Sequence, residues 1–233
     1  THTKPRRRTV TLGPSGATLT DVVDVARHGV TVTLSQEALD AVAAVRRHVE
    51  DLAAGDVPTY GISTGFGALA DKHIPVESRA QLQKSLIRSH AAGMGPQVEK
   101  EVVRALMFLR ATTLASGRTG VRPEVVQTMV DLLNADIIPV VHEYGSLGCS
   151  GDLAPLSHIA LALMGEGTVI GPEGDQREAS ELMAEAGITP LELREKEGLA
   201  LINGTEGMLG MLALALHDLD AVSYTHLTLP TSD

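Results

Sequence analysis

The sequence predicts a mainly helical fold with a few short strands near its N-terminus, and three observations support this. Apolar residues recur at helical spacing over most of the 233 residues, and glycine or proline separates one run from the next. Aromatic residues make up only 2% of the chain and tryptophan is absent, so the core must consist of Leu, Val, Ile, Ala and Met, a mixture that suits packed helices. Segments rich in Val and Thr are few and short.

The N-terminal part contains the expected strands and two helices. Val and Thr residues predict strands at Arg8–Leu12 and Val30–Leu34. Between them, Leu19–Arg27 is expected to form a helix that ends before a glycine. Ser35 is a suitable N-cap for a longer helix that stops at Gly55. The apolar positions of this helix are Leu39, Val42, Val45, Val49 and Leu52.

The rest of the chain is predicted to be helical around a glycine-rich loop at residues 60–67. Glycine and proline mark the ends of the remaining helices. These helices are expected at residues 76–91, 97–115, 123–134, 153–164 and 205–221. A small hairpin is expected at residues 168–178, because two short strand-like segments flank the turn Pro-Glu-Gly-Asp. No internal repeat and no low-complexity linker interrupts this pattern.

The C-terminal residues differ from the sequence before them. The last predicted helix gives way near Val222 to SYTHLTLPTSD, which is similar to cloning or assembly-junction sequence. We therefore expect two parts: residues 1–221, which carry the fold and the site, and residues 222–233, a tail foreign to the fold.

Composition excludes several classes of function. The formal net charge of −10 argues against a nucleic-acid-binding surface. The one cysteine excludes an internal disulfide and fits a reducing compartment. No signal peptide and no run of about 18 apolar residues is evident, so no membrane contact is expected. A cytoplasmic location follows as the expectation.

Residues 145–158, GSLGCSGDLAPLSH, carry the strongest chemical signal. In Cys149-Ser150-Gly151, the unhindered amide nitrogen of Gly151 can attack the carbonyl of Cys149 if the turn is held tightly. Loss of water closes a five-membered imidazolinone ring, and loss of a second water from Ser150 leaves a methylene conjugated to it. The product is an electrophile stronger than any standard side chain, made without an external cofactor.

Other interpretations of this segment are possible. It could be a glycine-rich turn before a helix that Asp152 caps, with Pro155 in the first turn. A phosphate-binding loop would end in GK[ST] and would not place an aspartate at the phosphate. A serine-hydrolase elbow requires G-x-S-x-G, which fails here at its last position. A thiol nucleophile would pair Cys149 with His142 or His158, but no third, orienting residue is evident.

Three further segments accompany the loop: YGISTGFG at 60–67, LQKSLIRSHAAGMG at 82–95 and LINGTEGMLGML at 201–212. Together, in this order, the four segments resemble those of the aromatic amino acid ammonia-lyase family, the methylidene-imidazolone type. The resemblance runs from about residue 9 to about residue 221 and covers only the N-terminal portion of the family's chain. One departure is Cys149, where many members carry alanine. Since only its carbonyl enters the ring, cyclisation is expected to survive.

The resemblance implies a multihelical fold of the fumarase and aspartase type, assembled as a homotetramer. It implies a methylidene-imidazolone group formed from Cys149-Ser150-Gly151, with no metal. The implied reaction removes ammonia from an aromatic amino acid. SHAAGMG resembles the histidine-specific branch, whose product from histidine is urocanate. The family's active site also uses residues from its second half, so these 233 residues alone are expected to have little activity.

The resemblance also implies roles for four residues outside the ring. Tyr60 would act as catalytic acid or base, in a loop whose glycines let it close as a lid. His90 would contact the substrate side chain, Asn203 the substrate or the ring, and Asp152 would support the turn. From the sequence alone, Tyr60 could be a structural turn residue, His90 a packed or capping histidine, and Asn203 a turn residue or N-cap.

Two alternative functions remain open. A tyrosine or phenylalanine ammonia-lyase, or an aminomutase of the same family, would share all four segments. An inactive, truncated family member would share them too. The remaining histidines show no metal-ligand spacing, so metal dependence is not expected.

Overall fold

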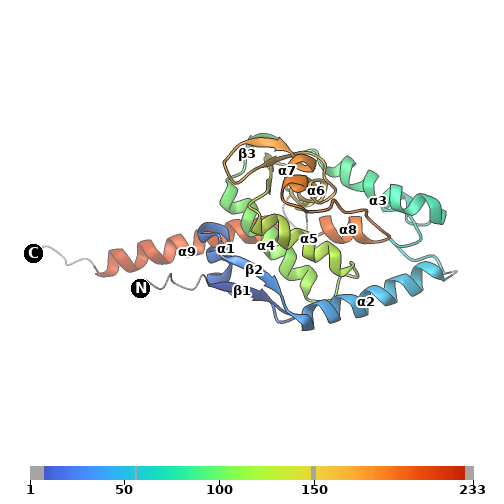
Figure 1. The fold of residues 1–233 in the computed structure, drawn as a ribbon, viewed down its shortest axis with the longest axis horizontal. Helices are drawn as coiled ribbons and strands as arrows, with labels where there is room; N and C mark the ends of the chain where they lie inside the picture. The colour runs from blue at the N-terminus through green and yellow to red at the C-terminus, as the bar shows by residue number, and fades with distance from the viewer. Residues whose placement is uncertain (1–7, 56, 148–150, 229–233) are drawn as a thin grey trace, which may run out of the picture.

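The computed structural model describes residues 8–55, 57–147 and 151–228, and it confirms the mainly helical fold (Figure 1). The α-helices are α1 (Leu19–His28), α2 (Gln36–Ala54), α3 (Val76–His90), α4 (Lys100–Ala115), α5 (Pro123–Asn134), α6 (Leu153–Leu163), α7 (Ala179–Glu185), α8 (Glu197–Ile202) and α9 (Glu206–Thr228). A short 3-10 helix, η1, spans Gly67–Leu69.

Strands are short and form three small sheets in the described residues. The strands are β1 (Thr9–Leu12), β2 (Thr31–Leu34), β3 (Met94–Gln97), β4 (Ile138–Pro139), β5 (His142–Tyr144), β6 (Thr168–Ile170) and β7 (Gln176–Glu178). Parallel β1 and β2 pair in register from Thr9 with Thr31 to Leu12 with Leu34. Antiparallel pairs join β3 to β5 and place β6 between β4 and β7. The predicted N-terminal strands and the hairpin of β6 and β7 are therefore present.

Local chemistry explains where the first helices begin and end. Thr18 forms a capping box with Asp21 at the start of α1, and Gly29 ends that helix at φ 60°, a conformation that glycine adopts without strain. At the start of α2, the Ser35 hydroxyl accepts a hydrogen bond from the amide of Ala38 at 3.1 Å, as a serine N-cap should. Pro123 occupies the first turn of α5.

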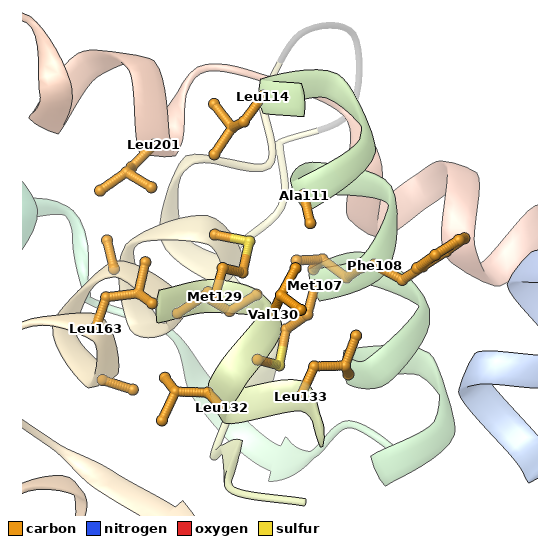
Figure 2. Packing of buried hydrophobic residues seen from close by; sticks show 14 of the residues in the cluster. Met107, Phe108, Ala111, Leu114, Met129, Val130, Leu132, Leu133, Leu163 and Leu201 are labelled. Atoms are coloured by element: carbon orange, nitrogen blue, oxygen red, sulfur yellow. The ribbon is translucent and has the colours of Figure 1, made fainter. Parts of the chain in front are cut away.

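Helix α4 forms the centre of the hydrophobic core. It packs against α5, α9 and α1, and ten of its residues are buried. Figure 2 shows Met107 and Ala111 of α4 facing Met129 of α5, whereas Phe108 points away from that contact. Both Met107 and Phe108 are fully buried. The scaffold that positions the loop at 145–152 is thus an aliphatic and methionine core, as the composition predicted.

Several elements differ from the expectations. Helix α4 begins at Lys100 rather than residue 97, because residues 94–97 pair with β5 as strand β3. The short helices α7 and α8, and the strands β3, β4 and β5, were not predicted. Tertiary pairing, rather than local preference, creates β3, whose sequence Met-Gly-Pro-Gln has little strand propensity.

Helix α9 continues to Thr228, so the expectation that helical structure ends near Val222 is wrong. Figure 1 shows its C-terminal part projecting from the body of the molecule. Among the described residues, the stretch Glu197–Tyr224 is long and apolar enough to cross a membrane, with a mean hydropathy of 1.5 over its apolar 18-residue window. No such run was expected from the sequence. A buried core helix has the same properties, and 44% of the apolar 18-residue window within this stretch is buried inside the protein.

Removal of residues 223–233 is expected to change the free energy of unfolding by less than about 0.5 kcal/mol. Val222 and Tyr224 are 66% and 72% exposed, so neither side chain contributes much buried apolar surface. Urea denaturation of the two chain lengths measures this difference. A loss of about 2 kcal/mol or more on truncation would mean that the tail packs against the fold.

Candidate active site

Ser146 and Asp152, on either side of the predicted ring, line one cavity together with residues of α4 and of the start of α9. Cys149 and Ser150, with Gly148, lie outside the described residues, but both flanks of the loop are described. The amide of Leu147 donates a hydrogen bond to the carbonyl oxygen of Gly151 at 3.0 Å. Gly151 is itself buried. The two flanks are therefore held together across the three residues between them.

Asp152 anchors the C-terminal flank of the loop to α9. Its side chain is fully buried, Oδ1 accepts a hydrogen bond from the Ser146 hydroxyl at 2.6 Å, and Oδ2 accepts one from the amide of Met208 at 3.0 Å. Met208 lies in the first turn of α9, where free amides and the helix dipole favour a carboxylate. The interpretation of Asp152 as a side-chain cap of α6 is wrong, because it makes no capping hydrogen bond to that helix.

Asn203 lies at the end of α8, next to the same flank. Its neighbour Gly204 accepts a hydrogen bond at its carbonyl from the amide of Asp152 at 3.2 Å. The side chain of Asn203 is exposed, and its carbonyl accepts a hydrogen bond from Arg110 at 3.0 Å. It follows α8 as the C-cap, so its alternative role as N-cap of α9 is wrong.

His90 is the last residue of α3 and is half-buried. Its Nδ1 lies 2.9 Å from the carbonyl oxygen of Leu86 and 3.0 Å from the Ser89 hydroxyl. Because a carbonyl can only accept, Nδ1 carries the proton in this arrangement, and Nε2 of the neutral ring is an acceptor. The ring thus caps its own helix through Nδ1, as the capping alternative proposed, and Nε2 makes no hydrogen bond to the described residues.

The residues after His90 run along the N-terminal flank of the loop. Met94 pairs with Tyr144, which directly precedes Gly145. Gly95 has φ +86°, and a Cβ there would lie 2.5 Å from the Tyr144 ring, so both the backbone conformation and the contact require glycine. The SHAAGMG segment and the loop segment are therefore neighbours in space.

Tyr60 is not brought to the loop by any contact of the described residues. Its side chain is 52% exposed, its hydroxyl accepts a hydrogen bond from the amide of Gly67 at 3.4 Å, and its ring meets Phe66 edge-on with centroids 6.2 Å apart. The loop at residues 60–67 packs on α8, since a Cβ on Gly61 would lie 3.3 Å from Leu199. The 60–67 loop that carries Tyr60 therefore lies beside α8, the helix that ends at Asn203, and the Tyr60 hydroxyl points toward Gly67 of the same 60–67 loop.

His142 and His158 are the candidate bases for a cysteine nucleophile. In the structure, their rings instead contact backbone atoms of the segment that follows His90. Nδ1 of His142 lies 2.9 Å from the carbonyl oxygen of Gly95, and Nε2 of His158 accepts a hydrogen bond from the amide of Gly93 at 3.1 Å. The two rings are 5.8 Å apart. Burial, with a smaller contribution from His142, lowers the pKa of His158 below its ordinary value. Both histidines thus fasten the segment after His90 to β5 and α6, the two elements on either side of the loop.

His158 is expected to make stability depend on pH, because its folded-state pKa is lowered. The pKa of this histidine in the unfolded chain is about 6.5, and in the folded protein it is lower. Between these two values the unfolded chain binds more protons than the folded one. The contribution of His158 to the free energy of unfolding is therefore fully present above about pH 6.5 and is lost as the pH falls toward the folded-state pKa. His158→Gln retains an acceptor for the Gly93 amide and does not titrate. In urea denaturation at several pH values, the free energy of unfolding should decrease less with falling pH for this variant than for the unmodified chain. An equal decrease in both proteins would contradict the role of His158 in the pH dependence.

Among the described residues, no group of three or more His, Cys, Asp or Glu side chains could hold a metal ion. Several groups around the loop were not predicted from the sequence: Ser146, the amide of Met208, and the buried ion pair of Arg110 with Glu206. A sequence signal for the pair existed in Arg110, a charged residue within the apolar run of α4.

A mainly helical fold joins Asp152 to the Asn-Gly turn and, through β3 and β5, brings the His-Ala-Ala-Gly segment beside Gly145. These are the segments by which the sequence resembles the aromatic amino acid lyases. The model of the family described as aromatic amino acid lyase matches residues 17–229. The chain belongs to this family.

Relatives and solved structures agree with this membership. The histidine ammonia-lyases of Streptomyces griseus and Streptomyces avermitilis are 69% and 68% identical to this chain over 91% and 92% of its length. A tyrosine ammonia-lyase of Cupriavidus metallidurans is 46% identical over 86%. The chain spans only 41%, 42% and 38% of these three relatives.

The family fold is also evident from two crystal structures. The ergothionase of Treponema denticola superimposes with a TM-score of 0.89 at 31% identity, over 93% of this chain and 43% of that one. The histidine ammonia-lyase of Trypanosoma cruzi gives 0.81 at 35% identity, over 89% of this chain and 40% of that one. The helical scaffold around the loop is thus the scaffold of the family.

Proposed function

We propose that the chain is the N-terminal portion of a histidine ammonia-lyase, which converts L-histidine to urocanate and ammonia without oxidation. The observation that carries this proposal is the difference in identity: 68–69% to histidine ammonia-lyases of two Streptomyces species, against 46% to a tyrosine ammonia-lyase. The matches cover comparable parts of this chain. Substrate preference therefore follows the closer group.

The residues of the loop fit a methylidene-imidazolone group built from Cys149, Ser150 and Gly151. Gly151 has no side chain to obstruct its amide nitrogen, and the Leu147–Gly151 hydrogen bond holds the flanks in a closed turn. Cyclisation requires such constraint, because a backbone amide is a poor nucleophile. When formed, the group supplies an electrophile to an elimination in which ammonia leaves poorly and the β-carbon is a weak acid.

The side chains of this chain then bind the substrate and move protons. Nε2 of His90 would accept a hydrogen bond from the substrate's imidazole while Nδ1 stays on the carbonyl of Leu86. The exposed amide of Asn203 would bind the substrate from the other flank. Tyr60 would transfer a proton, which requires its loop to move so that the Tyr60 hydroxyl leaves the amide of Gly67 and approaches the site.

A homotetramer in the cytoplasm is part of this proposal. Apolar side chains are exposed along α9, and such a surface is expected to be covered by other parts of an assembly. These exposed residues are Leu209, Met211, Leu212, Leu216, Leu219 and Val222. Analytical ultracentrifugation of the complete enzyme tests the tetramer, and a monomer at micromolar concentration would contradict it.

The proposed reaction is tested by supplying the complete enzyme with histidine, tyrosine and phenylalanine in separate assays. Urocanate from histidine, with little coumarate or cinnamate from the others, is the expected result. Preferential formation of coumarate or of a β-amino acid would instead assign the chain to the tyrosine ammonia-lyases or the aminomutases.

His90→Phe is expected to lower kcat/KM for histidine by about tenfold or more and to raise that for phenylalanine. A phenyl ring cannot accept the hydrogen bond of the imidazole substrate, so that polar group would be left unpaired in the site. Ser89→Ala is the matched control, because it removes a neighbour of Nδ1 and leaves Nε2 in place. Unchanged selectivity in His90→Phe would restrict His90 to its role as a helix cap.

A further inference from the structure

Arg110 is a charged residue in the interior of the protein. Its side chain is 3% exposed and lies in α4 between residues of the hydrophobic core. Burial of a guanidinium is costly unless its donors are well used. The way in which Arg110 uses its donors therefore indicates what the residue is for.

The donors of Arg110 meet both sides of the turn between α8 and α9. Nη1 contacts Oε1 of Glu206, the first residue of α9, at 2.7 Å. Nη2 donates to the carbonyl of Asn203 at 3.0 Å and also to the carbonyl of Ala200 in the last turn of α8. One guanidinium thus joins the end of one helix to the beginning of the next.

The pairing with Glu206 is incomplete, which shows that the arginine is not arranged for the strongest ion pair. Arginine and a carboxylate pair most strongly through two parallel hydrogen bonds. Here Nε of Arg110 and Oε2 of Glu206 are both buried without a hydrogen-bond partner among the described residues. Nη2 instead donates to the carbonyls of Ala200 in α8 and Asn203 in the turn.

Gly204 is enclosed by the same pair. A Cβ at Gly204 would overlap Oε2 of Glu206 and would lie 2.6 Å from Nη1 of Arg110. The backbone of the turn therefore packs directly on the ion pair, and any larger residue would displace one of the two. The carbonyl of Gly204, on the same turn, accepts the hydrogen bond from the amide of Asp152 at 3.2 Å.

We propose that Arg110 is a positioning residue, which holds the Asn203–Gly204 turn and, through it, the Gly151–Asp152 flank of the loop. The turn carries the exposed side chain of Asn203 on one side and the hydrogen bond to Asp152 on the other. Because Asp152 follows Gly151 directly, the turn also restrains the residue whose amide closes the ring. The catalytic consequence of this role rests on the proposed function. The contacts by which Arg110 restrains the turn do not depend on it.

The test compares two arginines of α4 in the complete enzyme. Arg110→Met/Glu206→Met removes the pair without leaving an unpaired buried charge. Arg104→Met is the matched control. Arg104 donates Nε and Nη2 to the carbonyl of Val25 at 3.0 and 2.8 Å and Nη1 to Asp136 at 2.7 Å, so it makes the same kinds of contact away from the turn. Arg110→Lys, which retains the charge and can reach fewer acceptors, is a milder third variant.

Three measurements separate positioning from general stability: amide exchange of peptides covering residues 151–156 and 203–208, the fraction of loop peptide lighter by two waters, and kcat with KM for histidine. In the double variant we expect about tenfold faster exchange in both peptides, a smaller dehydrated fraction and a lower kcat. Arg104→Met should leave all three unchanged, and Arg110→Lys should lie between.

Equal effects of the two arginine replacements, or unchanged exchange in the double variant, would overturn the positioning role. If the double variant does not fold, the contrast between Arg110→Lys and Arg104→Lys decides in the same way. Failure of the proposed function has a different signature: the unmodified enzyme would form no urocanate and would keep its loop undehydrated. The exchange contrast would still decide whether Arg110 holds the turn.

Discussion

Ser150→Ala in the complete enzyme is expected to lower kcat for urocanate formation by about a thousandfold or more. The methylene of the proposed electrophile derives from the serine side chain, and alanine has no hydroxyl to lose as water. The fold should be preserved, since the change removes one oxygen atom. Spectrophotometric detection of urocanate measures the activity, and circular dichroism with thermal unfolding checks the fold.

Ser157→Ala is the matched control for this result. Ser157 is fully buried in α6, and its hydroxyl has no hydrogen-bond partner among the described residues. The same serine-to-alanine change a few residues away should therefore leave both activity and stability almost unchanged. If Ser150→Ala retained a substantial part of the activity, or if both variants lost it equally, the serine at 150 would not be the source of the electrophile.

Asp152→Ala is expected to produce the largest loss of stability of any single change near the loop, about 3 kcal/mol. The carboxylate accepts hydrogen bonds from the Ser146 hydroxyl and the Met208 amide and is fully buried. Hydrogen bonds to a charged acceptor contribute about 1.5–3 kcal/mol each, and the amide in the first turn of α9 would lose its acceptor. Urea denaturation gives the difference in the free energy of unfolding.

Asp152→Asn separates shape from charge at the same position. Its amide can accept from Met208 and donate to the Ser146 hydroxyl, so we expect a loss of only about 1 kcal/mol. Equal and small losses in both variants would mean that the carboxylate does not join the loop to α9 in solution.

Most helices could be predicted from the sequence because their signals are local. Ser35 before α2 and Pro123 in α5 act within one turn of the residues they stabilise. The pairing of β3 with β5 could not be predicted in this way, since residues 94–97 gain their strand structure from partners some 47 residues later, as in the contact of Gly95 with His142. Helix α8 is only six residues long, too short for periodicity to indicate it.

In the candidate site too, local features could be predicted from the sequence, whereas contacts between distant residues could not. Its four segments are each contiguous, so their resemblance to the family could be seen in the sequence, and that resemblance implied roles for the loop, His90 and Asn203. The contacts that join the segments were not predictable, because Asp152 meets Met208 across 56 residues and Arg110 meets Glu206 across 96. Spacing along a chain carries no information about such partners. The expected contact of Tyr60 with the loop concerns a conformation in which its loop moves, and it stays a prediction.

The mass of the loop peptide tests the central claim most directly. Trypsin should release the loop in the peptide from Thr119 to Arg177, since the only internal arginine, Arg122, precedes a proline. If Cys149-Ser150-Gly151 cyclises, this peptide from the active, complete enzyme is lighter than its encoded mass by two waters, about 36 Da, and the Ser150→Ala peptide does not lose both. A peptide of full encoded mass from an active enzyme would contradict the self-made electrophile on which the proposed function depends.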